Sequence, residues 1–367
     1  MESTSPITTG WITLNTKCNN RCAWCYQLSE ITLNPTTMPF AMAEQLVDFY
    51  AGLDVLSCIF IGGEPTLYKG LGNLIARARA EGIQETTIVT NGRALSNRAY
   101  ALSLVEAGTD VFSVTIHSSK PEIHDRIAGV RSWEQTVKGI RNVIELGGKC
   151  ILNVVAGREN IEDIPSSIPW LLDLGVDGIT ISSAVGVVTS DTFDESHSID
   201  PREYAELVTH LKDAPNSVGF LHELPLCLYS KDIFEELVSH GKLGYGCHVG
   251  IGNGISVNPS GVTIACNSLF NLPMINLFDD GELKYSPDGL LYLWETDPGL
   301  LKLRETANVF RSETCRSCNL WNMCNSGCPL TWVSLNPDDY INDGLIDVDL
   351  TALPLPAINQ GGEICKQ

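Results

Sequence analysis

The chain is organised around the stretch Cys18-Asn-Asn-Arg-Cys22-Ala-Trp-Cys25-Tyr26, which follows the short apolar run 11–14. Three thiolates at CxxxCxxC spacing on a tight loop can bind three irons of a 4Fe–4S cube. The fourth iron then has no protein ligand and stays open to a substrate or cofactor, like the open position of a catalytic metal site. A zinc site or a redox loop is the alternative interpretation of this spacing.

Composition limits the possible functions of the 367-residue chain. Residues 1–6 are polar and lack the basic segment of a secretory signal, and no run of 18 apolar residues is present. We therefore expect a cytoplasmic protein without a membrane span. The formal net charge of −20 argues against a nucleic-acid partner. Thirteen cysteines in such a chain indicate metal binding and not disulfides. Cys58 and Cys150 lie in apolar runs and are expected to be buried.

Short β-rich runs alternate with helical periodicity from residue 11 to about residue 220. The expected strands are 11–15, 58–61, 86–90, 111–116, 150–155 and 178–182. The expected helices are 40–50, 71–81, 96–106, 133–146, 164–174 and 201–211. This alternation predicts parallel strands with crossover helices. An open sheet and a partial (β/α)6 barrel both fit the alternation. We expect the barrel domain over 1–225 and a cysteine-rich domain over 226–367.

Chemistry in such a barrel lies at the carboxyl ends of the strands, where three further motifs stand. Gly62-Gly63-Glu64-Pro65 follows the second expected strand, residues 90–92 end the third, and residues 115–118 end the fourth. The two glycines permit close backbone approach to a ligand, and the carboxylate can pair with an ammonium group. An ordinary strand-to-helix turn is the alternative for the glycine motif.

Together these motifs resemble the radical SAM superfamily, and the resemblance favours the partial (β/α)6 barrel. In that family, S-adenosylmethionine (SAM) binds the open iron and is cleaved reductively to a 5′-deoxyadenosyl radical. The resemblance implies cluster ligation by Cys18, Cys22 and Cys25. The implied cofactor-binding residues are Tyr26, Gly62, Gly63, Glu64, Pro65, Thr90, Asn91, Thr115 and Arg126, with Arg131 as an alternative to Arg126. Structural roles in turns and helix starts remain open for Thr90, Asn91, Thr115 and Arg126.

A second array of cysteines fills the C-terminal third, in the pattern C-x13-G-x4-C, C-x2-C-x5-C-x3-C and a final cysteine. Its members are Cys247, Cys266, Cys315, Cys318, Cys324, Cys328 and Cys365. The pattern resembles the SPASM extension of peptide-modifying radical SAM enzymes, such as maturases of ribosomal peptides and of sulfatases. Zinc is the alternative for the central cysteines. Residues 257–267 predict a hairpin within this region.

The SPASM resemblance implies two auxiliary 4Fe–4S clusters, three clusters in all. Cys247, Cys266 and Cys328 would hold the first, and Cys315, Cys318, Cys324 and Cys365 the second. The first set lacks a fourth thiolate or has an open iron, and we expect Cys227 to supply that ligand. A hydrogen-atom donor and an inert buried thiol are the two alternatives for Cys227.

The resemblance implies that a flavodoxin or ferredoxin supplies an electron and that the radical abstracts a hydrogen atom from a peptide side chain. The auxiliary clusters would accept an electron, giving an oxidative crosslink or a dehydrogenation. Epimerisation or dehydrogenation of a small molecule, such as a sugar or aminocyclitol, is the alternative. A non-catalytic iron–sulfur electron carrier is a further one, and the glycine motif argues against it.

Two features depart from the pattern of peptide-modifying relatives. The first expected strand begins near residue 11, which leaves no room for an N-terminal leader-recognition domain. Some relatives carry an acid after the second cysteine of the array, where this chain has Asn267. The candidates for a catalytic base are therefore only His117, Tyr245 and His248.

Overall fold

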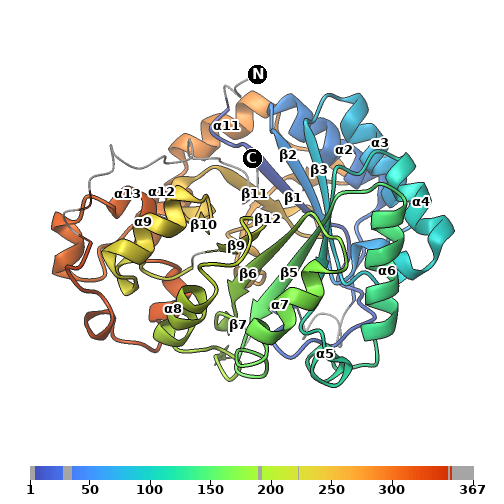
Figure 1. The fold of residues 1–367 in the computed structure, drawn as a ribbon. Helices are drawn as coiled ribbons and strands as arrows, with labels where there is room; N and C mark the ends of the chain where they lie inside the picture. The colour runs from blue at the N-terminus through green and yellow to red at the C-terminus, as the bar shows by residue number, and fades with distance from the viewer. Residues whose placement is uncertain (1–4, 28–34, 189–191, 222, 346–347, 349–367) are drawn as a thin grey trace.

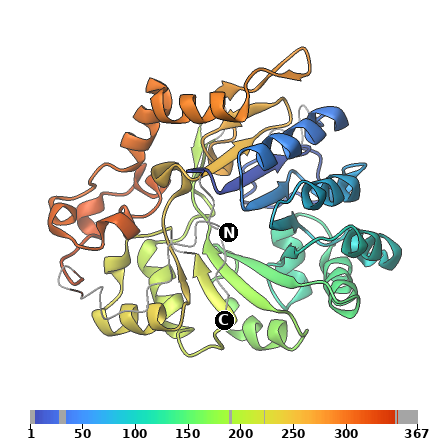
Figure 2. The same cartoon turned by 90° about the horizontal axis from the view of Figure 1, so that it is seen from above.

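The chain is built on one large, curved sheet (Figures 1 and 2). The computed structural model describes residues 5–27, 35–188, 192–221, 223–345 and 348. Six parallel strands form the centre of the sheet, and each pairs with the next along the chain. They are β1 (Thr9–Thr13), β2 (Ser57–Ile61), β3 (Glu85–Thr90), β4 (Val111–Thr115), β5 (Cys150–Ala156) and β6 (Gly178–Ser183). The α/β fold with a parallel core that the sequence predicts is confirmed.

Helices between these strands cover the outer face of the sheet (Figure 2). They are α2 (Phe40–Gly52), α3 (Leu71–Ala80), α4 (Arg98–Glu106), α5 (Pro121–Ala128), α6 (Trp133–Glu145), α7 (Ile164–Leu172) and α8 (Pro201–His210). Apolar residues at helical spacing form the buried side of each contact; in α6 these include Val137, Ile140 and Val143. The expected strands and helices agree with the observed ones to within about two residues at each end.

Apolar residues of the central strands pack into a layer of the core beneath the helices. Ile12, Phe60 and Ile88 are register neighbours on β1, β2 and β3, and all three are fully buried. Cys58 and Cys150 are also fully buried strand residues, as expected. Tight packing of this layer holds the carboxyl ends of the strands at fixed positions, and the candidate site is built there.

Strands that follow β6 in the chain extend the same sheet at both edges. Beyond β6 lie β9 (Val218–Leu221) and β10 (Leu243–Gly244), and beyond β1 lie β11 (Gly254–Val257), β12 (Val262–Ile264) and β13 (Pro273–Asn276). The expected hairpin is present as β11 and β12, but β11 also pairs in parallel with β1. The sheet is therefore continuous across residue 225, and the division into 1–225 and 226–367 stays a prediction.

Tyr50 of α2 ties the added strand β11 to the barrel. Its hydroxyl group donates to the carbonyl oxygen of Trp11 at 3.1 Å and lies 3.4 Å from that of Ile255. The Tyr50 ring occupies the space where a Cβ atom of Gly10 would stand, only 2.3 Å away. A glycine at this position of β1 is thus required by the tyrosine that bridges the two strands.

The rest of the C-terminal third consists of short helices and turns (Figure 1). Its helices are α9 (Lys231–Ser239), α10 (His248–Ile251), α11 (Pro287–Thr296), α12 (Pro298–Ala307) and α13 (Trp321–Cys324). Its 3₁₀ turns include η3 (Leu226–Leu228) and η5 (Glu313–Ser317), which carry cysteines. Two small ribbons, β7 (Val187–Val188) with β8 (Phe193–Asp194) and β14 (Phe278–Asp279) with β15 (Glu282–Leu283), complete the described strands. Within the described ranges, no helix is long and apolar enough to cross a membrane.

Candidate functional site

The loop that carries Cys18, Cys22 and Cys25 leaves the carboxyl end of β1 and packs against the glycine motif after β2. The backbone N–H of Gly63 donates to the carbonyl oxygen of Asn15 at 2.7 Å. The backbone N–H of Glu64 donates to the carbonyl oxygen of Lys17, also at 2.7 Å. A Cβ atom on Gly63 would stand 2.4 Å from the carbonyl oxygen of Thr16. The glycine motif therefore supports the backbone that leads into the cysteine loop.

Glu64 is buried and its carboxylate joins two motifs. Oε1 accepts hydrogen bonds from the backbone N–H of Thr66 at 3.0 Å and from the hydroxyl groups of Thr66 at 2.5 Å and Thr90 at 2.6 Å. Oε2 accepts from the backbone N–H of Asn91 at 2.8 Å. Burial raises the pKa of the Glu64 carboxyl, and these hydrogen bonds oppose that rise. Glu64 thus holds the ends of β2 and β3 together, while contact of this carboxylate with SAM stays a prediction.

Asn91 and Arg93, which follow β3, bind the cysteine loop from the other side. The Asn91 amide donates to Asn19 Oδ1 at 2.7 Å and lies 3.9 Å from the Cys18 sulfur. The Arg93 guanidinium donates to the carbonyl oxygen of Asn19 and, at 3.0 Å, to Asn20 Oδ1. Sequence analysis missed Arg93; an arginine directly after Asn91-Gly92 was the signal available.

The open carbonyl end of α5 provides a third support. The backbone N–H groups of Arg21 and Ala23 donate to the carbonyl oxygens of Ala128, at 2.8 Å, and Ile127, at 3.0 Å. The last carbonyls of a helix have no partner within the helix, so they are free to bind a neighbouring loop. Arg126 of this helix is exposed and donates to the Glu159 carbonyl oxygen at 3.1 Å. Contact of Arg126 with SAM stays a prediction.

The three loop thiols lie close enough together to influence one another electrostatically. Burial raises the pKa of Cys22 to about 12 and that of Cys25 to about 11, and the charges of neighbouring loop thiols add to both rises. Burial likewise raises the pKa of Cys18. The thiols must therefore lose protons when a metal binds. No three His, Cys, Asp or Glu side chains in the described ranges meet as single-ion ligands would. A cube needs another arrangement, because each of its irons takes one thiolate.

Buried polar atoms without a hydrogen-bond partner gather at the strand ends beside the loop. Among the described residues they include Thr13 Oγ1, Asn15 Oδ1, Asn153 Oδ1 and His117 Nδ1. Asn153 of β5 is the register neighbour of Thr115, the last residue of β4. Because buried polar atoms are normally paired, this arrangement fits a polar ligand within the barrel. The residues present are thus suited to SAM beside a thiolate-bound cluster.

Aromatic side chains enclose the loop. The Trp24 ring lies edge-on to His117 at 5.2 Å between centroids, and burial lowers the pKa of His117 to about 3. His117 is therefore neutral at physiological pH. Tyr26 is partly buried, desolvation raises the pKa of its hydroxyl group, and the charges of Cys25 and Cys266 add to that rise.

The other two candidates for a catalytic base lie near Cys247. His248 begins α10, stacks edge-on against Trp11 at 4.7 Å, and its Nδ1 lies 2.8 Å from Asn253 Oδ1. Tyr245 is half-buried, and burial raises the pKa of its hydroxyl group. A base role for His117, Tyr245 or His248 stays a prediction.

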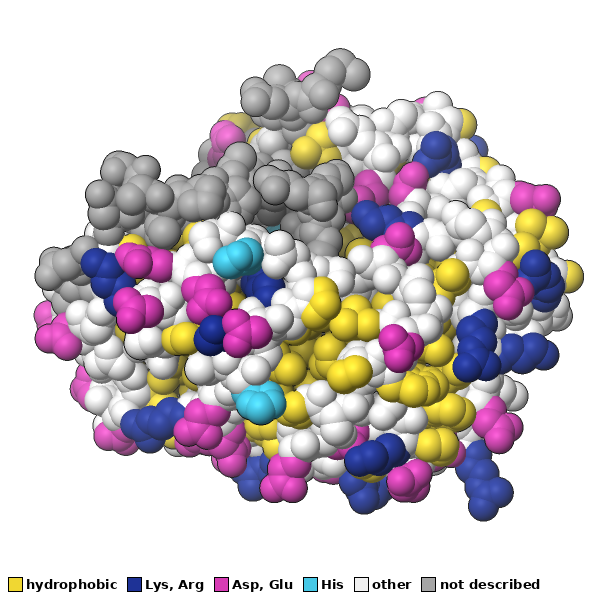
Figure 3. All heavy atoms as spheres, in the orientation of Figure 1, with side chains coloured by type: hydrophobic (Ala, Val, Ile, Leu, Met, Phe, Trp, Pro, Cys, Tyr) yellow, Lys and Arg dark blue, Asp and Glu magenta, His cyan; other side chains and the backbone are white. Residues whose placement is uncertain are grey.

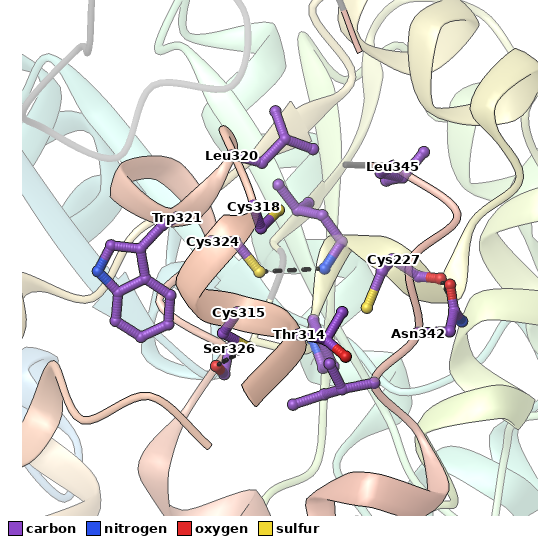
Figure 4. A pocket seen from close by; sticks show the side chains of 13 residues that line it. Cys227, Thr314, Cys315, Cys318, Leu320, Trp321, Cys324, Ser326, Asn342 and Leu345 are labelled. Carbon is purple, nitrogen blue, oxygen red and sulfur yellow. Dashed lines mark hydrogen bonds between the residues drawn. The ribbon is translucent and has the colours of Figure 1, made fainter. Parts of the chain in front are cut away.

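The C-terminal thiols form two groups. In the first group, the charges of Cys247 and Cys266 contribute to the raised pKa of Cys328, which identifies the three as neighbours. The second group comprises Cys315, Cys318 and Cys324, which line one pocket together with Cys227 (Figure 4). The structure thus places Cys227 beside the second group and not beside the first, and ligation of the first cluster by Cys227 stays a prediction. Its turn, η3, packs against α13 and η5, which carry the second group. The expected ligand Cys365 lies outside the described residues.

Glu223 is the acidic residue that sequence analysis did not single out. Its Oε2 accepts a hydrogen bond at 3.1 Å from the hydroxyl group of Ser183, at the end of β6. Its carbonyl oxygen accepts from the backbone N–H of Cys328 at 2.6 Å. Burial raises the pKa of this carboxyl to about 7. An acid just before the Pro225-Leu226-Cys227 turn was a weak signal, because only folding brings it beside the first group.

Replacing Arg93 by methionine is expected to loosen the cysteine loop without unfolding the barrel. Loss of a guanidinium that binds Asn19 and Asn20 costs about 1–2 kcal/mol, so iron should leave the loop about five- to thirtyfold faster in the presence of a chelator. Absorbance decay with excess chelator measures this rate. Arg98→Met is the matched control, because the partner of Arg98 among the described residues is the exposed Glu145, far from the cysteine loop in sequence. Equal rates for both variants would contradict the anchoring role.

Comparison with known proteins gives three findings. Residues 12–171 match the Radical SAM superfamily. A "Probable GTP 3′,8-cyclase" of Saccharolobus islandicus (strain Y.N.15.51 / Yellowstone #2) is 30% identical over 173 residues, which are 46% of this chain and 54% of that protein. One from Thermococcus kodakarensis is 30% identical over 149 residues, 41% of this chain and 48% of that protein. The chain spans about half the length of these curated relatives.

Solved structures share the fold over most of the chain. SuiB of Streptococcus suis, bound to S-adenosylmethionine, superposes with a TM-score of 0.66 at 19% identity, covering 93% of this chain and 77% of SuiB. The enzyme anSMEcpe, with bound AdoMet, gives 0.67 at 16% identity, covering 90% of this chain and 89% of its own. At these identities the similarity is one of fold. It extends beyond residues 12–171 into the cysteine-rich third.

Proposed function

We propose that this chain, whose residues 12–171 match the Radical SAM superfamily, is an enzyme that cleaves SAM reductively to modify a peptide side chain. One observation carries the proposal: the cysteine loop, the glycine motif and Asn91 meet at one edge of the parallel sheet. There, Cys18, Cys22 and Cys25 would hold a 4Fe–4S cluster. Gly62 to Pro65, with Tyr26, Thr90, Asn91, Thr115 and Arg126, would line the SAM site.

Bound together, such a cluster and SAM supply one-electron cleavage of a carbon–sulfur bond, giving methionine and a 5′-deoxyadenosyl radical that takes a hydrogen atom from the substrate. The chain's own side chains position and shield this chemistry. Asn91 directs its amide toward the Cys18 sulfur, and hydrogen bonds to sulfur tune the reduction potential of clusters. Trp24 packs edge-on against the buried His117 beside the loop and would shield one side of the cluster.

The two C-terminal thiol groups would hold two auxiliary 4Fe–4S clusters, as in a SPASM domain. Both donor sets consist of thiols, which suit iron–sulfur clusters. Most of these thiols are partly buried, and desolvation raises the pKa of Cys266 to about 11 and that of Cys324 to about 12. The proposed source of electrons is a flavodoxin or ferredoxin.

The charged surface of the chain is mixed. On the face drawn in Figure 3, acidic side chains are interspersed with basic ones.

Two solved relatives support a peptide as the substrate. SuiB has been solved with its precursor peptide SuiA, and anSMEcpe with the Cp18Cys and Kp18Cys peptides. SuiB and anSMEcpe share the fold of this chain across both the barrel and the cysteine-rich third. A peptide lying between these two parts would reach both the cysteine loop and the first C-terminal thiol group. We therefore expect an oxidised or crosslinked peptide as the product.

A small-molecule substrate is the second candidate, and the curated relatives favour it. Proteins named "Probable GTP 3′,8-cyclase" are 30% identical to this chain over less than half of its length. Incubation with SAM, reductant and either GTP or a deuterated peptide encoded beside the gene separates the two candidates. Deuterium transfer from the peptide into 5′-deoxyadenosine supports the peptide. A product derived from GTP, with no deuterium transfer from the peptide, would overturn the peptide proposal and identify the nucleotide as the substrate.

The test of the proposed chemistry compares the native chain with a Cys18/Cys22/Cys25→Ala variant after anaerobic reconstitution. We expect about twelve irons in the native chain and about eight in the variant, since three cubes become two. Only the native chain should release 5′-deoxyadenosine from SAM under dithionite. The variant should retain the absorbance of its C-terminal clusters. About four irons in the native chain, with zinc at the C-terminal cysteines, would refute the three-cluster proposal.

A further inference from the structure

We infer that Cys227 is the fourth thiolate of the cluster at Cys315, Cys318 and Cys324, which leaves the first group with three thiolates. The inference rests on the proposed auxiliary clusters. Cys227 therefore belongs to the second auxiliary cluster and not, as the sequence had suggested, to the first. It takes the ligand role expected for Cys365, although it lies 88 positions before Cys315.

The pocket carries the argument. Cys227, Cys315, Cys318 and Cys324 all line it, with Cys227 on the wall opposite the other three residues (Figure 4). The cavity between them has a volume of about 20 Å³. Four thiols from three separate segments around one space are the ligand number of a complete 4Fe–4S site.

Direct contacts hold the turn of Cys227 against the second group. The backbone N–H of Leu226 donates to the Cys324 sulfur at 3.3 Å, so the residue before Cys227 already binds a proposed ligand atom. On the other side, the Asn342 amide donates to the Cys227 carbonyl oxygen at 2.9 Å. Two anchors on successive residues orient this turn and position its thiol.

The walls of the pocket suit a buried cluster. Leu320, Trp321, Ile341 and Leu345 line it with apolar surface, and Ser326 Oγ lies 3.3 Å from the Cys315 sulfur. Apolar walls restrict water, and a hydroxyl group beside a ligand sulfur can stabilise its thiolate.

The first group differs in its surroundings. Its member Cys328 donates its backbone N–H to the carbonyl oxygen of Glu223 at 2.6 Å. The Glu223 carboxylate in turn accepts a hydrogen bond from Ser183 at the end of β6, which connects this group to the barrel. With Cys227 in the second group, the first group keeps three thiolates.

The test uses the full-length chain, reconstituted anaerobically and reduced, with electron paramagnetic resonance and iron content as readouts. Cys324→Ala and Cys328→Ala first identify the signals of the second and first auxiliary clusters. Cys227→Ala is expected to remove or alter the Cys324-dependent signal, with loss of about one to four irons per chain. Cys365→Ala is expected to leave both auxiliary signals intact. Cys227→Ser should retain part of the signal, because a serine oxygen is a weaker ligand at the same position.

Each outcome decides the inference. The inference fails if Cys227→Ala loses the Cys328-dependent signal or leaves the Cys324-dependent signal unchanged. It also fails if Cys365→Ala loses the Cys324-dependent signal. An intact signal from the Cys18, Cys22 and Cys25 cluster shows that the variant has folded. If the native chain yields no auxiliary signal, the proposed auxiliary clusters fail, and that result is distinct from failure of the Cys227 assignment.

Discussion

Gly63→Ala is expected to abolish iron binding at the Cys18, Cys22 and Cys25 loop, lowering the iron content from about twelve to about eight per chain. The added Cβ atom would stand 2.4 Å from the carbonyl oxygen of Thr16 and 2.5 Å from that of Lys17. Both obstacles are backbone atoms, so no side-chain rotation can relieve the clash. The loop must move away, and its three thiols then no longer face one cube.

Gly72→Ala is the matched control for this experiment. A Cβ atom on Gly72 meets only side-chain carbon atoms at 3.7 and 3.8 Å, which is ordinary van der Waals contact. Gly72 lies in α3, where alanine favours the helix by about 1 kcal/mol. Iron content and 5′-deoxyadenosine release should match those of the native chain in Gly72→Ala and fall in Gly63→Ala. Full iron loading of Gly63→Ala would refute the proposed support of the loop.

Glu64→Ala is expected to destabilise the metal-free chain by about 2–4 kcal/mol. The variant leaves four donors without their acceptor: two from Thr66, one from Thr90 and one from Asn91. Each unpaired buried donor costs about 1–3 kcal/mol, while relief from burying a carboxylate offsets part of that sum. The hydrogen-bond loss outweighs the relief because the carboxylate is fully paired in the native chain.

Denaturant unfolding followed by circular dichroism measures this loss. Glu122→Ala is the control, since Glu122 is exposed on α5 and its loss should change stability by less than about 0.5 kcal/mol. Glu64→Gln keeps one carbonyl oxygen and should retain about half of the stability that Glu64→Ala loses. SAM cleavage should also fall in Glu64→Ala, because Thr90 and Asn91 lose the group that holds them. A stability equal to that of Glu122→Ala would show that the hydrogen bonds contribute little.

The sequence was sufficient where the signal is local. Alternating runs located the six central strands and their helices to within about two residues, because period-2 and period-3.6 patterns are properties of neighbouring residues. The glycine motif was singled out for its closeness to a ligand. The structure adds a second reason, since Gly62 and Gly63 also lie against the backbone of the cysteine loop.

Contacts between residues far apart in the chain could not be predicted from such local patterns. Arg93 and Glu223 carry no motif, and their importance comes from partners on other segments. The pairing of β11 with β1 was also not expected, because edge pairing depends on which strand is left without a neighbour and not on the composition of either strand.

By itself, the sequence determined the parallel α/β core and the loop of Cys18, Cys22 and Cys25, since both follow from periodicity and short spacing. Only the tertiary structure decided how the C-terminal thiols are grouped. The contact between Leu226 and Cys324 joins residues 98 positions apart, and many chain paths satisfy the same cysteine spacing. Packing of η3 against α13 selects one of them and brings Cys227 beside Cys315, Cys318 and Cys324.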